Sequence, residues 1–211
     1  MREYAEGAGI DFSRRQIAAL ADLQNKVLAA NEYMNLTAIT RDDEFTVKHI
    51  IDSLTLLPYI KQGASLVDIG TGAGFPGIVL GIMREDIKLT LIESTGKKVN
   101  FLRETLEFLK LSDVECVHGR AEEWARQGYR YDVCTARAVA KLDKLAGYAL
   151  PILHAGGMLF AMKGKDVLEE IENAKPALKK KGGVFERVDY LKLTDDITHS
   201  VVVVKKAATS K

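Results

Sequence analysis

A glycine-rich run at residues 68–77 is the part of this sequence that most clearly indicates chemistry. It reads Asp-Ile-Gly-Thr-Gly-Ala-Gly-Phe-Pro-Gly and directly follows the apolar pair Leu66-Val67, as in a strand that turns sharply into a helix. Gly70 and Gly72 have no Cβ atom, so a ligand can approach their main chain, and the following helix directs free N–H groups to the same place. The run predicts a nucleotide-like ligand, although tight turns without a ligand also use glycine.

The spacing of the glycines separates this loop from a dinucleotide site. The dinucleotide fingerprint is G-x-G-x-x-G, whereas this run has G-x-G-x-G and places Phe75 at the third-glycine position. Glu93 ends the next apolar run, at about the distance where an acid meets a ribose diol, and its two oxygens can accept from both hydroxyls. With Asp68 two residues before the first glycine, the pattern resembles the S-adenosylmethionine site of class I methyltransferases.

Residues that follow the predicted strands form one set of candidates, because ligands of open α/β sheets bind at the carboxyl ends of the strands. Glu122 could help to read an adenine edge, or it could simply suit the start of a helix, where an acid favours the dipole. The candidate cofactor residues are Gly70, Gly72, Phe75, Glu93, Ser94, Thr95, Ala121, Glu122 and Arg137.

Basic side chains gather at the same predicted edge. They are Lys97, Lys98, Arg137, Lys141, Lys163 and Lys165. Lys97 and Lys98 would occupy the first turn of a helix, where the dipole disfavours cations, and an RNA phosphate would explain their placement. Solvated lysine is the alternative for each. We expect no metal site, because cysteine and histidine are scattered along the chain.

The motifs that the chain lacks reduce the number of candidate atoms for methylation. Enzymes that methylate exocyclic amines usually carry [D/N]-P-P-[Y/F] after the fourth strand, where this chain has Thr-Ala-Arg-Ala at 135–138. Cys134 falls inside a predicted strand, which disfavours it as the nucleophile for carbon-5 methylation. The N7 atom of guanine has a free in-plane lone pair and needs no proton removal, so positioning and electrostatics would suffice. No residue is assigned as catalytic.

The elements that must position these residues alternate in type. Ser13 and Gln16 form a capping box, which predicts a helix that begins near Arg14, and a second helix is expected between Thr40 and Pro58. Strand-like runs occupy 66–70, 88–93, 114–119, 131–136 and 158–162, with helical patterns between them. This alternation predicts a mostly parallel sheet, and the closely linked runs 184–193 and 200–206 should pair antiparallel.

Length and composition allow one α/β domain with an added helical segment. The chain has 211 residues, 47% of them hydrophobic and 28% charged, with a formal net charge of +1. We expect an N-terminal helical extension at 1–62 and a class I methyltransferase domain at 63–211. The charged N-terminus lacks the apolar core of a signal peptide, and no apolar run is long enough to span a membrane, so we expect a cytoplasmic protein without membrane contact.

Several segments, taken in order, carry a family resemblance. They are 35–37 (Asn-Leu-Thr), 49–54 (His-Ile-Ile-Asp-Ser-Leu), 68–77, 93–98 (Glu-Ser-Thr-Gly-Lys-Lys), 120–122, 137–138 and 163–164. Over nearly its whole length the chain resembles the RsmG (GidB) family of bacterial 16S ribosomal RNA guanine-N7 methyltransferases. The resemblance implies a class I fold, S-adenosylmethionine as methyl donor, and a guanine of the 16S decoding region as acceptor, in naked RNA or in the small ribosomal subunit.

By the same resemblance, the cofactor residues named above line the donor site, and Arg137 holds the methionine carboxylate, an RNA phosphate, or both. Asn35, His49 and Asp52 would face the RNA or cover the site, although helix-to-sheet packing is an equal alternative. Lys97, Lys163 and Lys165 are the expected RNA contacts. We also expect a monomer, and we expect removal of Arg137 to cost turnover more than stability, on the premise that it lies in an edge loop.

Two other functions compete with this interpretation. A nucleotide-dependent oxidoreductase on a related fold would need a third glycine at position 75, which the sequence lacks. A non-enzymatic ribosomal RNA-binding assembly factor would retain the fold without the reaction.

Overall fold

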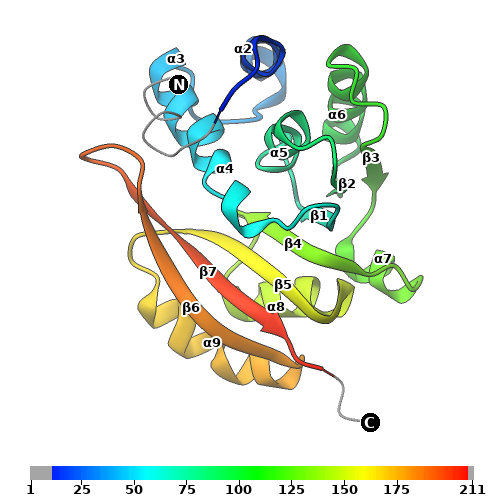
Figure 1. The fold of residues 1–211 in the computed structure, drawn as a ribbon, viewed down its shortest axis with the longest axis vertical. Coiled ribbons are helices and arrows are strands. Elements are labelled where there is room, and N and C mark those ends of the chain that lie inside the picture. Colours follow the sequence, from blue (N-terminus) through cyan, green and yellow to red (C-terminus); the bar gives the residue numbers. More distant parts are fainter. Residues whose placement is uncertain (1–10, 209–211) are drawn as a thin grey trace.

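A seven-stranded β-sheet organises residues 11–208, which are the residues that the computed structural model describes (Figure 1). Its strands lie in the order β3-β2-β1-β4-β5-β7-β6. The first five pair in parallel, and β7 pairs antiparallel with both β5 and β6. The strands are β1 (Ser65–Ile69), β2 (Lys88–Glu93), β3 (Glu115–His118), β4 (Tyr131–Arg137), β5 (Leu153–Gly164), β6 (Gly183–Lys192) and β7 (Thr198–Lys206).

All seven predicted strands are present, and the predicted antiparallel hairpin is confirmed. Two boundaries differ in ways that matter. The strand β5 begins at Leu153, five residues before its predicted start, because its first part also pairs with β4. Arg137 is the last residue of β4 and pairs with Met162 of β5. The premise that Arg137 lies in an edge loop is therefore wrong.

Helices cover both faces of the sheet and make three layers (Figure 1). One face carries α2 (Arg14–Met34), α3 (Asp42–Phe45), α4 (Asp52–Leu54), α5 (Gly77–Met83) and α6 (Gly96–Phe108); the other carries α7 (Ala121–Arg126), α8 (Leu142–Ala149) and α9 (Leu168–Lys180). Two buried apolar clusters fill the spaces between the layers. Short 3-10 turns occupy Leu57–Tyr59 (η2) and Leu150–Ile152 (η3).

The first N-terminal helix begins where the sequence predicts, and the second lies within its predicted bounds. Ser13 and Gln16 form the capping box of α2, and Asn35 ends that helix in the left-handed conformation with φ of 50°. The second predicted helix runs from α3 through a π-helical segment, η1 (Thr46–Ile51), into α4; the π turn was not foreseen. Leu20 and Leu23 of α2 join the same apolar cluster as the sheet. The division of the chain near residue 62 stays a prediction.

Gly77, the first residue of α5, is the glycine that lets a helix pack closely on the sheet. A Cβ atom there would lie 2.3 Å from Leu91 Cδ2 and 2.9 Å from Asp68 Oδ2. Its amide donates a 3.0 Å hydrogen bond to the same Asp68 oxygen. Phe75, at the expected third-glycine position, is buried instead. The close-packing role therefore falls two residues later than in the dinucleotide fingerprint.

We expect Gly77→Ala to destabilise the protein by about 1–3 kcal/mol, since the added methyl group must displace well-packed neighbours. Urea unfolding monitored by circular dichroism measures this. Gly147→Ala in α8 is the matched control: a Cβ there meets nothing within 4 Å, so the change should be neutral or stabilise by up to about 1 kcal/mol. Equal midpoints for the two variants would contradict the packing argument.

Candidate functional site

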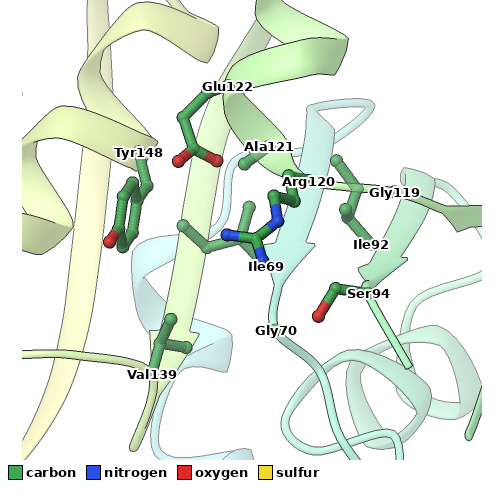
Figure 2. Close-up of a pocket in the computed structure, with 10 residues that line it drawn as sticks. All are labelled: Ile69, Gly70, Ile92, Ser94, Gly119, Arg120, Ala121, Glu122, Val139 and Tyr148. Atoms are coloured by element: carbon green, nitrogen blue, oxygen red, sulfur yellow. The ribbon is translucent and has the colours of Figure 1, made fainter.

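A cavity opens at the carboxyl ends of β1, β2 and β3, beside the glycine loop. We call it the loop cavity. Its lining residues are Ile69, Gly70, Ile92, Ser94, Gly119, Arg120, Ala121, Glu122, Val139 and Tyr148. In Figure 2, Tyr148 and Val139 stand on one side and Ser94 on the other, while the Arg120 side chain reaches into the space between them. The cavity combines apolar strand ends with a few polar groups, as small-molecule sites do.

Four of the predicted cofactor residues meet in the loop cavity: Gly70, Ser94, Ala121 and Glu122. Gly70 has φ of 63° and is exposed. A Cβ atom at this position would lie 2.9 Å from a methyl group of Val139. A side chain at position 70 would therefore be strained and would crowd the cavity wall.

Glu93 ties the glycine loop to the start of α6. Its Oε2 accepts a hydrogen bond from the Gly72 amide at 3.1 Å, and its Oε1 accepts one from the Thr95 amide at 2.8 Å. The side chain is almost completely buried. Each carboxylate oxygen has a second lone pair, so Glu93 can brace the loop and still accept a hydroxyl. Glu93, Gly72 and Thr95 adjoin the loop cavity without lining it.

Asp68 lies in the core beneath the loop and supports it. Its oxygens accept hydrogen bonds from Thr135 Oγ1 at 2.8 Å and from the Gly77 amide at 3.0 Å. Burial raises the pKa of Asp68 from 3.8 to about 6, against the opposing effect of these hydrogen bonds. The carboxyl group is fully shielded from solvent, so it acts on the loop rather than on a ligand.

We expect Asp68 to make the stability of the protein depend on pH. Because its pKa is higher in the folded chain, its contribution is fully present below pH 3.8 and is lost as pH rises through about 6. Between pH 4 and pH 7 the unfolding free energy of the wild type should therefore fall by about 2 kcal/mol relative to that of Asp68→Asn. Urea titrations across this range measure the difference, and the exposed Asp22→Asn is the control. Parallel curves for Asp68→Asn and the wild type would refute the assignment.

Arg137 is held by the N-terminal helical segment. Its guanidinium donates to the Lys48 carbonyl at 2.9 Å, to Asp52 Oδ2 at 3.1 Å and to His49 Nδ1 at 2.9 Å. His199 Nδ1 lies against the other oxygen of Asp52. These residues come from η1, α4, β4 and β7, so a single polar network joins the beginning, the middle and the end of the chain.

His49 is neutral within this network. Burial, and next the nearby Arg137 charge, lower the pKa of His49 from 6.5 to about 3. Its Nδ1 therefore accepts from Arg137, which leaves Nε2–H to donate to Thr37 Oγ1 at 2.8 Å. The imidazole stacks on Phe75, with ring centroids 4.8 Å apart. Phe75 thus packs against the helical segment and away from the loop cavity.

The predicted RNA contacts divide into exposed and internally bonded groups. Lys97, Lys165 and Asn35 are exposed. Lys163 is mostly buried, and its ammonium donates to the Ala140 carbonyl at 2.7 Å and to Glu170 at 2.6 Å. His49 and Asp52 belong to the Arg137 network, as the helix-packing alternative anticipated. The RNA and cofactor roles of all these residues stay predictions.

Comparison with known proteins identifies the family. The sequence matches the family described as GidB, rRNA small subunit methyltransferase G, over residues 16–199. The chain belongs to this family. Relatives named ribosomal RNA small subunit methyltransferase G include one from Clostridium botulinum (strain Loch Maree / Type A3), 41% identical over 93% of this chain and 85% of the relative. Another, from Acetivibrio thermocellus, is 43% identical over 97% of this chain and 86% of the relative.

Solved structures share the fold. An O-methyltransferase from Bacillus cereus in complex with SAH has a TM-score of 0.63 and 16% identity, over 97% of this chain and 96% of that one. TYW2 from M. jannaschii, in complex with AdoMet, has a TM-score of 0.57 and 19% identity, over 74% of each chain. The GidB-family chain therefore has the class I methyltransferase fold that the sequence predicts. No helix among residues 11–208 is long and apolar enough to cross a membrane.

Several residues of the loop cavity escaped the prediction. Ile69 is the last residue of β1 and Ile92 the last but one of β2, each one position before a predicted candidate, so the strand-end rule could have found them. Arg120 stands just before Ala121, within the family segment 120–122. Val139 follows the end of β4, and Tyr148 comes from the far end of α8. Nothing in the sequence distinguishes Tyr148 from an ordinary partly buried helix residue.

Proposed function

We propose that this protein transfers the methyl group of S-adenosylmethionine to N7 of a specific guanine in the decoding region of 16S ribosomal RNA. The observation that carries the proposal is membership of the rRNA small subunit methyltransferase G family over residues 16–199. The loop cavity, with Glu93 beside it, supplies the matching donor site. A non-enzymatic assembly factor would not require a donor cavity with an acidic residue beside it.

The residues around the loop cavity fit S-adenosylmethionine. The Gly70 main chain is exposed, and Ile69 and Ile92, among the last residues of β1 and β2, give an apolar surface for an adenine. Glu93 offers oxygens for the ribose diol. When bound, this cofactor supplies a methyl group activated by a positively charged sulfur.

The chain's own residues bind and orient rather than exchange protons. Guanine N7 carries a free lone pair, so the transfer requires in-line placement and a suitable electrostatic environment. Asp68 and Asp52 lie near this edge of the sheet, but both already accept hydrogen bonds within the protein. Holding Glu93, the glycine loop and the Arg137 network rigid is therefore the main contribution of the fold.

Methyl transfer to small-subunit RNA tests the proposal. The purified protein would be incubated with labelled S-adenosylmethionine and 30S subunits, or 16S RNA, from cells that lack this methylation. Borohydride and aniline treatment cleaves RNA at N7-methylguanine, so we expect one new cleavage site in the decoding region. Label on another base atom would refute the N7 assignment, and absence of label in RNA would refute the enzyme.

We also propose that the protein acts in the cytoplasm, where its RNA substrate is made, and that it works as a monomer. Analytical ultracentrifugation at micromolar concentration measures the second point. A stable dimer would contradict it.

A further inference from the structure

A second cavity lies on the other side of the segment that follows β4. We call it the hairpin cavity, because Leu193 and Ile197, at the tip of the β6–β7 hairpin, form part of its lining together with Met162 of β5. Its volume is about 340 Å³, within the range of small-ligand sites. Of the predicted cofactor residues, only Arg137 lines this cavity.

Residues 137–139 separate the hairpin cavity from the loop cavity. Arg137 and Ala138 line the hairpin cavity, whereas Val139 lines the loop cavity, and Figure 2 shows Val139 facing into the latter. Ala138 has φ of 56°, a left-handed conformation that is uncommon for residues with a side chain and costs energy. Ala138 lines one cavity and its neighbour Val139 lines the other. The two cavities therefore flank the same short segment at the end of β4, which brings a ligand in one close to a ligand in the other.

The hairpin tip is a closed turn that presents two apolar side chains together. The Leu193 amide donates to the Ile197 carbonyl at 2.8 Å, and the Ile197 amide donates to Thr194 Oγ1 at 3.2 Å. Leu193 is buried and Ile197 is half-buried. With Met162 and Ala138 they give the cavity a largely apolar lining, which suits a flat ring more than a charged group.

Each cation that lines the hairpin cavity already has a carboxylate partner. Arg137 is paired with Asp52 at 3.1 Å and Lys163 with Glu170 at 2.6 Å; Lys48 is paired with Glu44. A phosphate would need an unpaired cation, and among the described lining residues none is free. The charge pattern therefore favours a neutral aromatic base inside the cavity, with the RNA backbone outside it.

We propose that the hairpin cavity binds the guanine that receives the methyl group, and that Leu193 and Ile197 form the wall that positions it against the donor. This inference rests on the proposed function. The polar network of Arg137, Asp52 and His199 borders the cavity and fixes its walls relative to one another. Leu193 and Ile197 are positioning residues: they hold the base without taking part in bond changes.

Filling the cavity tests the inference. Ile197→Trp should lower kcat/KM for methyl transfer to 16S RNA at least tenfold, while the Kd for S-adenosylhomocysteine, measured by calorimetry, stays within twofold of the wild type. The matched control is Asp196→Trp, because Asp196 is exposed on the same turn and does not line the cavity; it should transfer methyl at the wild-type rate. Ile197→Glu adds a charge with little bulk and should lower kcat/KM in the same way. It replaces Ile197→Trp in the experiment if that variant does not fold.

The outcomes separate this inference from the proposed function. If the wild type methylates the RNA and folded Ile197 variants are equally active, the inference fails and the function stands. If Asp196→Trp loses as much activity as Ile197→Trp, the effect comes from the outside of the turn and the inference also fails. If the wild type transfers no methyl to RNA, both are overturned.

Discussion

Glu93→Ala is expected to weaken binding of S-adenosylmethionine about 100-fold. The variant would lack the two hydrogen bonds that the ribose hydroxyls donate to the carboxylate. Each is worth ~1.5 kcal/mol to a charged acceptor, or ~3 kcal/mol together. The same change also removes the acceptor for the Gly72 and Thr95 amides, so the loop is less well held for the cofactor. Calorimetry with S-adenosylhomocysteine measures the affinity directly.

Two variants make this experiment specific. Glu93→Gln keeps one acceptor oxygen and should fall between the wild type and Glu93→Ala. Glu107→Ala removes an exposed carboxylate from α6 and should leave the affinity unchanged, which controls for the loss of charge. An unaltered Kd for Glu93→Ala would show that the acid braces the loop without touching the ribose.

Arg137→Ala is expected to lose folding stability and activity together. Arg137 bonds to Lys48, His49 and Asp52. Its removal leaves the nearly buried Asp52 carboxylate without the guanidinium, with only His199 beside it. Breaking a buried ion pair from one side costs about 3–5 kcal/mol. The wild type and the variant would be compared by urea unfolding and by methyl transfer at the same temperature.

This expectation replaces the one drawn from the sequence, in which turnover would suffer more than stability. Arg137→Lys keeps the charge but lacks the planar guanidinium, whose two terminal nitrogens reach the three acceptors together, so we expect it to recover only part of the stability. Lys144→Ala, at an exposed position of α8, is the control and should change neither property. A folded Arg137→Ala with wild-type stability and no activity would restore the earlier expectation.

The sequence predicted the sheet because each strand carries its own local signal. Apolar runs bounded by turn residues located β1 to β4 within one or two residues, and the short link after residue 193 indicated the antiparallel hairpin. The Ser13–Gln16 capping box located α2 for the same reason: its atoms lie three residues apart. Signals of this kind need no knowledge of the tertiary structure.

The site was only partly predictable because much of it depends on contacts between distant segments. Gly70, Ser94 and Glu122 follow strands, so the strand-end rule found them. The partners of Arg137 lie 85 to 89 residues earlier in the chain, and no local pattern links them to it. The π turn at Thr46–Ile51, the left-handed Ala138 and the position of Tyr148 likewise follow from packing that a single sequence does not reveal.

The polar network around Asp52 bears on whether the helical segment could ever be exchanged or discarded. Asp52 contacts both Arg137 and His199, and Leu20 and Leu23 share a core with the sheet. A chain shortened to begin near residue 63 would expose that core. It would also leave the side chains of Arg137 and His199 without the Asp52 carboxylate. The residues after 63 are therefore not expected to fold and act without the N-terminal helices. A chimaera that exchanges these helices would need matching substitutions at residues 137 and 199.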